Sequence, residues 1–289
     1  MHKFAYEQAG SVAEATRLLT EEPDSLVLAG GTAAVVMLTL GLVRPRLVVD
    51  IGAIEGLHAM EQTGNAYRLG ALTSVRMLEA SADVKRRCPL LAEAASQVGS
   101  VRVRNAATVG GAIAYGEPQT DVPVALVALG ASVEIVSGEG QRTMALDEFF
   151  HAPYETDLAP GEIVAGVSIP SADDRTGGCH VKFTIGSIEH KPVANVSAIV
   201  RLSDAGVCED ARIVAGAVGP TPLVAERAAA LLRGTQLTGG DIAEAARIAS
   251  EEADPIDDLR GSVWYKRRIV RALVERGLKC AILRSKTTG

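Results

Sequence analysis

The chain has 289 residues, of which 47% are hydrophobic, and a formal net charge of −6 at pH 7. Its length predicts two domains of ordinary size. The acidic balance, without any run of lysines and arginines, argues against a nucleic-acid partner, which requires a basic face. The cysteines lie far apart and form no C-x-x-C pair, so the sequence indicates no disulfide framework, zinc site or iron–sulfur site. We expect a reducing cytoplasmic location, because the N-terminus also lacks the pattern of a signal peptide.

The first elements alternate between helix and strand. Ser11 and Glu14 have the spacing of a capping box, which predicts a helix that ends near Pro23. A strand over 26–28, a helix over 33–40 and a buried strand over 46–51 follow. No charge falls between Asp24 and Arg44, so a membrane-spanning helix is an alternative for this stretch. The glycines near its start weaken that alternative, because glycine costs about 1 kcal/mol inside a helix.

The rest of the chain divides at a polar, turn-rich stretch, residues 171–178, which we predict to be a linker. Before it, the pattern predicts a hairpin that turns at Gly64 and Asn65, helices near 74–80 and 89–98, a hairpin over 131–146 and a strand over 162–170. After it come strands near 180–185, 193–202 and 208–218, then helices near 222–232, 241–252 and 262–284. Strands followed by helices predict an α+β second domain with three antiparallel strands.

Two glycine segments are candidates for holding a phosphate. Ala29-Gly30-Gly31-Thr32 lies between a predicted strand and a predicted helix. Glycines let backbone amides approach a ligand closely, and the first amides of a helix favour an anion. A tight turn is the simpler explanation of either segment alone. A second Thr-x-Gly-Gly segment at Thr108, followed by Asp121, suggests a large cofactor. Neither segment is a dinucleotide G-x-G-x-x-G motif or a P-loop.

Three stretches, residues 28–57, 101–123 and 211–234, closely resemble the FAD-binding medium subunit of the molybdenum hydroxylases, the xanthine dehydrogenase and carbon monoxide dehydrogenase family. The resemblance extends from about residue 3 to residue 284. It implies an α+β fold with an FAD-binding domain of the vanillyl-alcohol-oxidase type over 1–175. That domain would consist of two α+β subdomains, about 1–55 and 56–175. A C-terminal domain over 176–289 would contain a three-stranded antiparallel sheet and three helices.

The resemblance also implies cofactor contacts. The FAD diphosphate would be held by Ala29, Gly30, Gly31, Thr32, Ala33 and Ala34. A second wall would be formed by Thr108, Val109, Gly110, Gly111 and Ala112.

Three single residues complete the implied cofactor site. Asp121 would bond a polar part of the flavin cofactor, although an N-cap of the following helix is an alternative. Val164 would pack on the adenine, although ordinary packing in a strand explains it equally well. Lys182 would lie near the isoalloxazine, where a cation could stabilise the reduced flavin. Exposed lysines at strand ends are common, so a surface role is the alternative for Lys182.

The chain departs from the family at three places. Many relatives have Gly-Gly-Asn where this chain has Ala112, which removes one side-chain contact. Many have Gly-Asp and an aromatic ring beside the flavin, where this chain has His190 and Lys191. His190 could tune a flavin proton, although a lone histidine is more often a surface residue. Ala33 and Ala34 replace polar residues of some relatives, which matters least because the inferred contacts are through the backbone.

By resemblance, the chain carries FAD and passes electrons to NAD, a quinone or oxygen. The electrons would come from [2Fe-2S] clusters of a small iron–sulfur subunit, and a large subunit would hold the molybdenum cofactor. We expect a heterohexamer with two copies of each chain and no integral membrane association. The alternatives are a stand-alone FAD-dependent oxidoreductase and a non-catalytic assembly subunit that has lost FAD. By resemblance, the substrate would bind to the large subunit, so the fold of this chain does not determine it.

Overall fold

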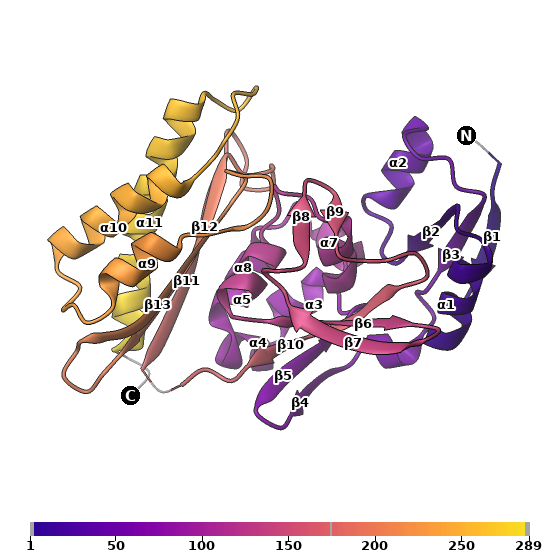
Figure 1. Ribbon diagram of the computed structural model, residues 1–289, viewed down its shortest axis with the longest axis horizontal. Helices are drawn as coiled ribbons and strands as arrows, with labels where there is room; N and C mark the ends of the chain where they lie inside the picture. The colour runs from indigo at the N-terminus through magenta and orange to yellow at the C-terminus, as the bar shows by residue number, and fades with distance from the viewer. Residues whose placement is uncertain (1–2, 174, 287–289) are drawn as a thin grey trace.

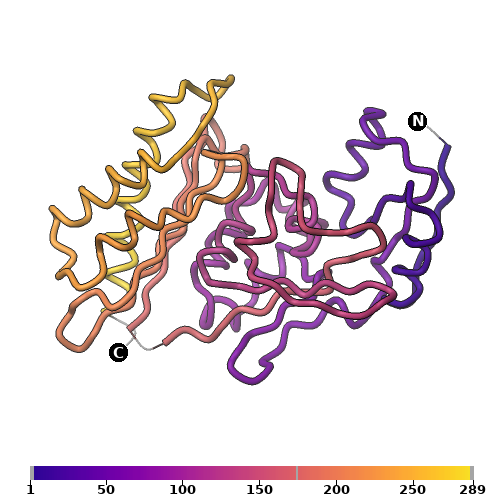
Figure 2. Tube along the Cα trace, in the orientation of Figure 1, coloured from indigo at the N-terminus to yellow at the C-terminus, as the bar shows by residue number. Residues whose placement is uncertain are grey.

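The computed structural model describes residues 3–173 and 175–286 as an elongated molecule with strand β1 and helix α10 at opposite ends (Figure 1). Figure 2 follows the chain from an indigo N-terminal part, through a purple and magenta middle part, to an orange and yellow C-terminal part. Each of the three parts is built around its own β-sheet. The fold is of the α+β class, as predicted.

The N-terminal part is a parallel sheet with strand order β1-β3-β2. Parallel strands need crossover connections, which here contain the two helices. The elements are β1 (Ala5–Gln8), α1 (Val12–Glu21), β2 (Ser25–Leu28), α2 (Ala34–Leu40) and β3 (Leu47–Asp50). The apolar run that predicted a buried strand is the central strand β3, and Leu47, Val48 and Val49 are buried. The carboxylate of Glu14 accepts from the amide of Gly10 and not from that of Ser11, so the predicted capping box is incomplete.

The stretch considered as a membrane span forms β2, the glycine segment and α2. Among the described residues, no helix is both long enough and apolar enough to cross a membrane. Helix α2 consists only of apolar residues and one threonine, yet Leu38 is its only buried residue.

The middle part is an antiparallel sheet with strand order β4-β5-β10-β6-β7, accompanied by short helices. Its strands are β4 (Met60–Thr63), β5 (Ala66–Gly70), β6 (Ser132–Ser137), β7 (Gly140–Ala145) and β10 (Ile163–Pro170). Its helices are η1 (Glu55–Leu57), α3 (Val75–Ala80), α4 (Ala82–Arg87), α5 (Pro89–Ser96), α6 (Val101–Ala106), α7 (Val109–Tyr115) and α8 (Val122–Ala128). The small hairpin β8 (Phe150–Ala152) and β9 (Glu155–Thr156) lies outside this sheet. The predicted hairpins and helices are present, whereas α4, α6 and α7 were not predicted.

The C-terminal part is a sheet with strand order β11-β12-β13-β14, covered by helices. Its elements are β11 (Thr176–Phe183), β12 (Ala194–Leu202), β13 (Cys208–Gly216), β14 (Leu223–Val224), α9 (Glu226–Leu232), α10 (Gly239–Glu252) and α11 (Val263–Ser285). Helices α9, α10 and α11 confirm the predicted three helices. The sheet has a fourth, two-residue strand, because the chain after Pro222 stays extended and pairs with Val214 and Ala215 before α9 begins.

The predicted linker over 171–178 is too long at its C-terminal end, because β11 already begins at Thr176. The glycines that suggested a turn serve packing instead. A Cβ atom on Gly177 would lie 2.0 Å from the carbonyl oxygen of Ala281 in α11. The missing side chain therefore lets the longest helix approach the sheet closely.

Apolar packing joins the N-terminal and middle parts. The core under the parallel sheet includes Val49 and Ile51, but also Ile163 and Ala165 of β10. Val136 of β6 packs against the same cluster. The first sheet therefore buries its apolar face against two strands of the middle part, β6 and β10, which come much later in the chain.

Candidate functional site

The first glycine segment, residues 29–34, leads from β2 into α2. Gly31 has φ +70°, a left-handed conformation that glycine adopts without strain. Within the described chain, the backbone amides of Gly30 to Ala34 donate no hydrogen bond to any protein group. A run of unpaired amides with no negative side chain among them suits an anionic ligand such as a diphosphate.

The second glycine segment meets the first. A Cβ atom on Gly30 would lie 1.7 Å from the carbonyl oxygen of Ala106 and 3.3 Å from the amide nitrogen of Ala107. Only glycine permits this approach of two backbones. Thr108 and Gly110 follow directly, so the structure brings the two predicted glycine segments together.

The two segments differ in how they use their amides. Gly110 donates to the Ala71 carbonyl at 2.8 Å, and Gly111 donates to the hydroxyl of Thr108 at 3.1 Å. Val109 and Ala112 are also bonded within the protein. The second segment is therefore a wall fixed by internal bonds, and the first segment is the one with free donors.

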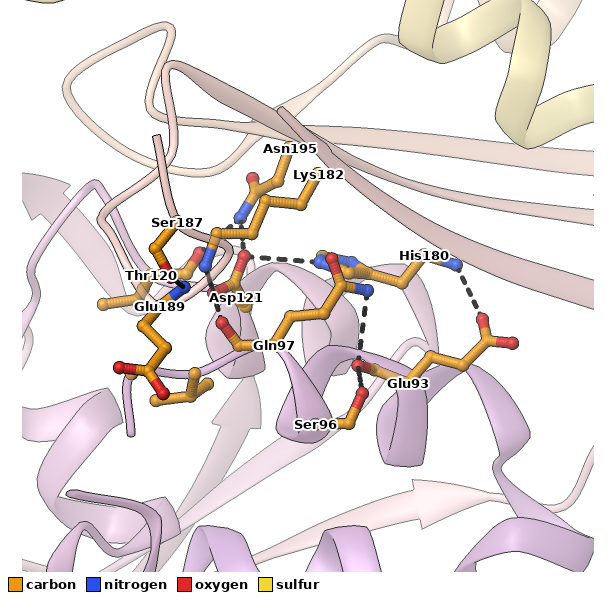
Figure 3. Close-up of polar contacts among 12 residues, drawn as sticks. Glu93, Ser96, Gln97, Thr120, Asp121, His180, Lys182, Ser187, Glu189 and Asn195 are labelled. Carbon is orange, nitrogen blue, oxygen red and sulfur yellow. Dashed lines mark hydrogen bonds and ion pairs between the residues drawn. The ribbon is translucent and has the colours of Figure 1, made fainter. Parts of the chain in front are cut away.

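Asp121 lies on a seam between the middle part and the C-terminal sheet. Its carboxylate accepts from Asn195 Nδ2 at 2.7 Å and from Lys182 Nζ at 2.8 Å, and His180 Nε2 lies 3.3 Å away (Figure 3). Lys182 also donates to the Gln97 carbonyl at 2.7 Å. The side chains of Asp121 and Lys182 are only 4% and 2% exposed. Asp121 occupies the N-cap position of α8, but its carboxylate makes no capping hydrogen bond to that helix.

The two strands that supply the partners of Asp121 explain the cluster. In the register of β11 and β12, His180 lies opposite Ser197 and Lys182 lies opposite Asn195. Alternate residues of a strand share one face, so all four belong to the same face of the sheet. His180 Nδ1 lies 2.8 Å from the Ser197 hydroxyl, which fixes the ring. Polar residues at alternate positions of two otherwise apolar strands are the sequence signal that would have located these partners.

The pKa of the Asp121 carboxyl reflects two opposing effects. Burial by itself raises the pKa, because it disfavours the charged form. The hydrogen bond from His180 and the nearby His180 and Lys182 charges outweigh burial and hold the pKa of Asp121 below its ordinary value. The carboxylate is thus stabilised as an anion within the seam.

Lys191 pairs with the buried carboxylate of Glu117. Glu117 also accepts from the Tyr154 hydroxyl at 3.1 Å, and the rings of Tyr154 and Tyr115 are 5.1 Å apart. Burial and the Glu117 charge raise the pKa of Tyr154 to about 12. The sequence reasoning missed these tyrosines, which bring aromatic rings close to the partner of Lys191.

The remaining predicted residues are less connected to the site. His190 is exposed, and its Nδ1 lies 2.8 Å from the Ile185 carbonyl of its own loop. Val164 is 5% exposed and belongs to the apolar core of the middle part, as expected for ordinary packing in a strand. Its contact with adenine stays a prediction.

Comparison with protein families supports a flavin site. Residues 2–172 match the family described as "FAD binding domain in molybdopterin dehydrogenase", and residues 189–281 match "CO dehydrogenase flavoprotein C-terminal domain". The chain is 32% identical over 286 residues to the 6-hydroxypseudooxynicotine dehydrogenase complex subunit alpha of Paenarthrobacter nicotinovorans, covering 99% of this chain and 96% of that one. It is also 32% identical over 280 residues to the carbon monoxide dehydrogenase medium chain of Hydrogenophaga pseudoflava, covering 96% and 97%.

Solved structures are similar over nearly the whole chain. A structure of carbon monoxide dehydrogenase from Hydrogenophaga pseudoflava contains a chain with a TM-score of 0.95 and 34% identity, covering 98% of both chains. Quinoline 2-oxidoreductase from Pseudomonas putida 86 contains one with a TM-score of 0.93 and 26% identity, also covering 98% of both chains.

Proposed function

Because this chain belongs to the FAD-binding subunits of the molybdopterin dehydrogenase family, we propose that it accepts electrons from [2Fe-2S] clusters of a partner subunit and delivers them through FAD to an external acceptor. The acceptor would be NAD, a quinone or oxygen. The observation that carries the cofactor assignment is the run of unpaired amides from Gly30 to Ala34 beside the backbone of Ala106. FAD, when bound, supplies the electron-transfer chemistry.

The residues present fit this cofactor. The amides of residues 30–34 would hold the diphosphate, and the bonded segment from Thr108 to Ala112 would keep the opposite wall in place. The Lys182 ammonium has three N–H groups, of which Gln97 and Asp121 use two, so one remains for a flavin atom. Asp121, whose oxygens are occupied by protein donors, would act mainly by positioning Lys182.

We propose the following assembly and domain limits. The partners would be a small iron–sulfur subunit and a large molybdenum-cofactor subunit, in a heterohexamer with two copies of each chain. Relatives named as a medium chain or as a subunit of a dehydrogenase complex support an assembly of several chains. The FAD-binding domain would comprise residues 1–175, with subdomains of about 1–55 and 56–175, and the C-terminal domain residues 176–289. The chain would be located in the cytoplasm, because its four cysteines are free thiols, as is usual in a reducing compartment.

Flavin content tests the cofactor assignment. We expect the purified chain to show the visible absorption of a bound flavin and Gly31→Asp to lose it, because the new carboxylate would repel the diphosphate. Gly41→Asp is the matched control: Gly41 has φ +68°, nothing lies within 4 Å of its Cβ position, and it follows α2 instead of preceding it. The left-handed backbone is therefore matched, although a Cβ atom at residue 31 would also lie 3.1 Å from Val35 Cγ2. A colourless wild-type chain that takes up no added FAD would overturn the proposal.

A further inference from the structure

A surface on the C-terminal part combines exposed apolar residues with arginines at the start of α11. We call it the Trp264 patch and define it by Leu259, Arg260, Trp264, Arg267, Arg268 and Arg271. Trp264 is 65% exposed, and Leu259 is fully exposed at the tip of the turn between Asp258 and Gly261. A hollow of about 540 Å³ between the end of α10 and the start of α11 includes Trp264 and three of the arginines.

The apolar part of the Trp264 patch is unusual for a free surface. The tips of turns usually carry glycine, asparagine, aspartate or serine, whereas this turn carries the apolar Leu259 at its tip. Ile256, just before the turn, is 73% exposed. Tryptophan and arginine are the residues most enriched among those that dominate protein interfaces. The composition of the patch therefore indicates a protein-binding surface.

The arginines of the Trp264 patch carry charge that the described chain leaves largely unbalanced. Arg268 lies over the Trp264 ring at 4.8 Å, and Arg267 donates to the Ala253 carbonyl. Among the described residues, neither the Arg260 nor the Arg268 guanidinium forms an ion pair within 4 Å, although the Arg260 charge helps to lower the pKa of Asp258. Arg271 reaches Glu275 at 3.6 Å.

The carboxylates closest to the Trp264 patch already bind other groups of the chain. Asp257 accepts from the amide of Val263, and Asp258 pairs with Lys266 at 2.9 Å. The patch is thus a positive area on a chain whose net charge is −6. It complements an acidic surface.

A second copy of the chain does not suit this surface. A twofold interface through the patch would place the same arginines against each other, because such an interface uses one surface on both copies. Like charges would then oppose association. A different, acidic protein is the appropriate occupant.

The position of the Trp264 patch indicates which acidic protein would bind to it. Tyr265, next to Trp264, packs its ring 6.5 Å from that of Phe183, next to Lys182. The start of α11 therefore adjoins the end of β11, where the lysine of the cofactor site lies (Figure 1). A protein that binds the patch would therefore lie on the side of the C-terminal part that carries Lys182. An electron donor must bind close to the cofactor, so this position suits one.

We propose that the Trp264 patch is the docking surface for an acidic face of the iron–sulfur subunit. This proposal rests on the proposed function, because it requires an iron–sulfur subunit as the partner. Trp264 anchors the contact, and Arg260, Arg268 and Arg271 pair with carboxylates of that subunit. Since exposed charge pairs are screened, docking weakens as the Debye length falls from about 10 Å at 0.1 M salt to about 3 Å at 1 M.

The test uses Trp264 as its own probe, because it is the only tryptophan of the chain. The FAD-loaded chain, labelled with 5-fluorotryptophan, has one fluorine resonance. We expect this resonance to shift when the purified iron–sulfur subunit is added, and the shift to be lost at high salt. The double variant Arg268→Glu/Arg271→Glu should weaken binding of the subunit, measured by analytical ultracentrifugation, by about 30-fold or more.

The controls separate docking from folding and from the flavin assignment. Arg233→Glu makes the same type of charge change on an exposed arginine of the same part, where the partner is Asp210, and should leave binding unchanged. All variants should keep their FAD and circular dichroism spectrum. If the chain holds FAD and binds the subunit without any fluorine shift, the patch proposal is wrong and the proposed function stands. A shift caused by NAD⁺ or by the large subunit alone would also overturn it. Absence of FAD would instead reject the proposed function.

Discussion

Replacing Lys182 by methionine tests how strongly the seam holds the middle and C-terminal parts together. The substitution keeps the length of the side chain but removes the ammonium that pairs with Asp121 and caps the Gln97 carbonyl. Both charged side chains are at least 96% buried, so solvent cannot replace the lost partner. Removing one member of a buried pair costs about 3–5 kcal/mol. Because Asn195 and His180 still donate to the carboxylate, we expect a loss of about 3 kcal/mol.

The assay is urea-induced unfolding of the FAD-loaded chain, followed by circular dichroism. Lys279→Met is the matched control, because Lys279 pairs with Glu275 at 3.8 Å but is 61% exposed. Exposed pairs contribute about 0–1 kcal/mol, so this variant should change little. Asp121→Asn combined with Lys182→Met should lose less than the sum of the single changes, by about 1–3 kcal/mol. Equal effects of Lys182→Met and Lys279→Met would refute the reasoning.

Two further predictions concern titrating groups. Since the folded pKa of Asp121 is depressed, its contribution to stability is present above the unfolded pKa of about 3.9 and is lost as pH falls through the lower folded value. In acid titrations, Asp121→Asn should therefore show a flatter decline in unfolding free energy below about pH 4, and an unchanged slope would contradict this. Burial raises the pKa of Cys88 and of Cys208 to about 11. Iodoacetamide at about pH 8, where roughly one thiol in a thousand is ionised, should leave both unmodified until urea is added, as mass spectrometry would show; rapid labelling of the native chain would be the contrary result.

Local patterns predicted most elements, but not the contacts that define the site. The strand around Val48 and the three C-terminal helices follow from apolar periodicity, which depends only on neighbouring residues. The glycines of the second segment looked like those of the first, although their amides are bonded inside the protein. That difference depends on Ala71, which is brought close only by the tertiary fold.

The partners of Asp121 show the same limit. His180 and Asn195 follow it by 59 and 74 residues. The alternating polar residues of their strands indicate that one face of the sheet carries polar side chains. Only the packing of that sheet against α8 reveals that the face meets a carboxylate.

The core shared between the first sheet and β10 also determines when the protein can fold during synthesis. Val49 and Ile51 find their apolar neighbours Ile163 and Ala165 only after those residues have left the ribosome. At about 5–20 residues per second, this interval lasts on the order of ten seconds. During that time the growing polypeptide displays an uncovered parallel sheet, the kind of surface that chaperones bind. A fragment that stops before β10 would leave this core without Ile163 and Ala165.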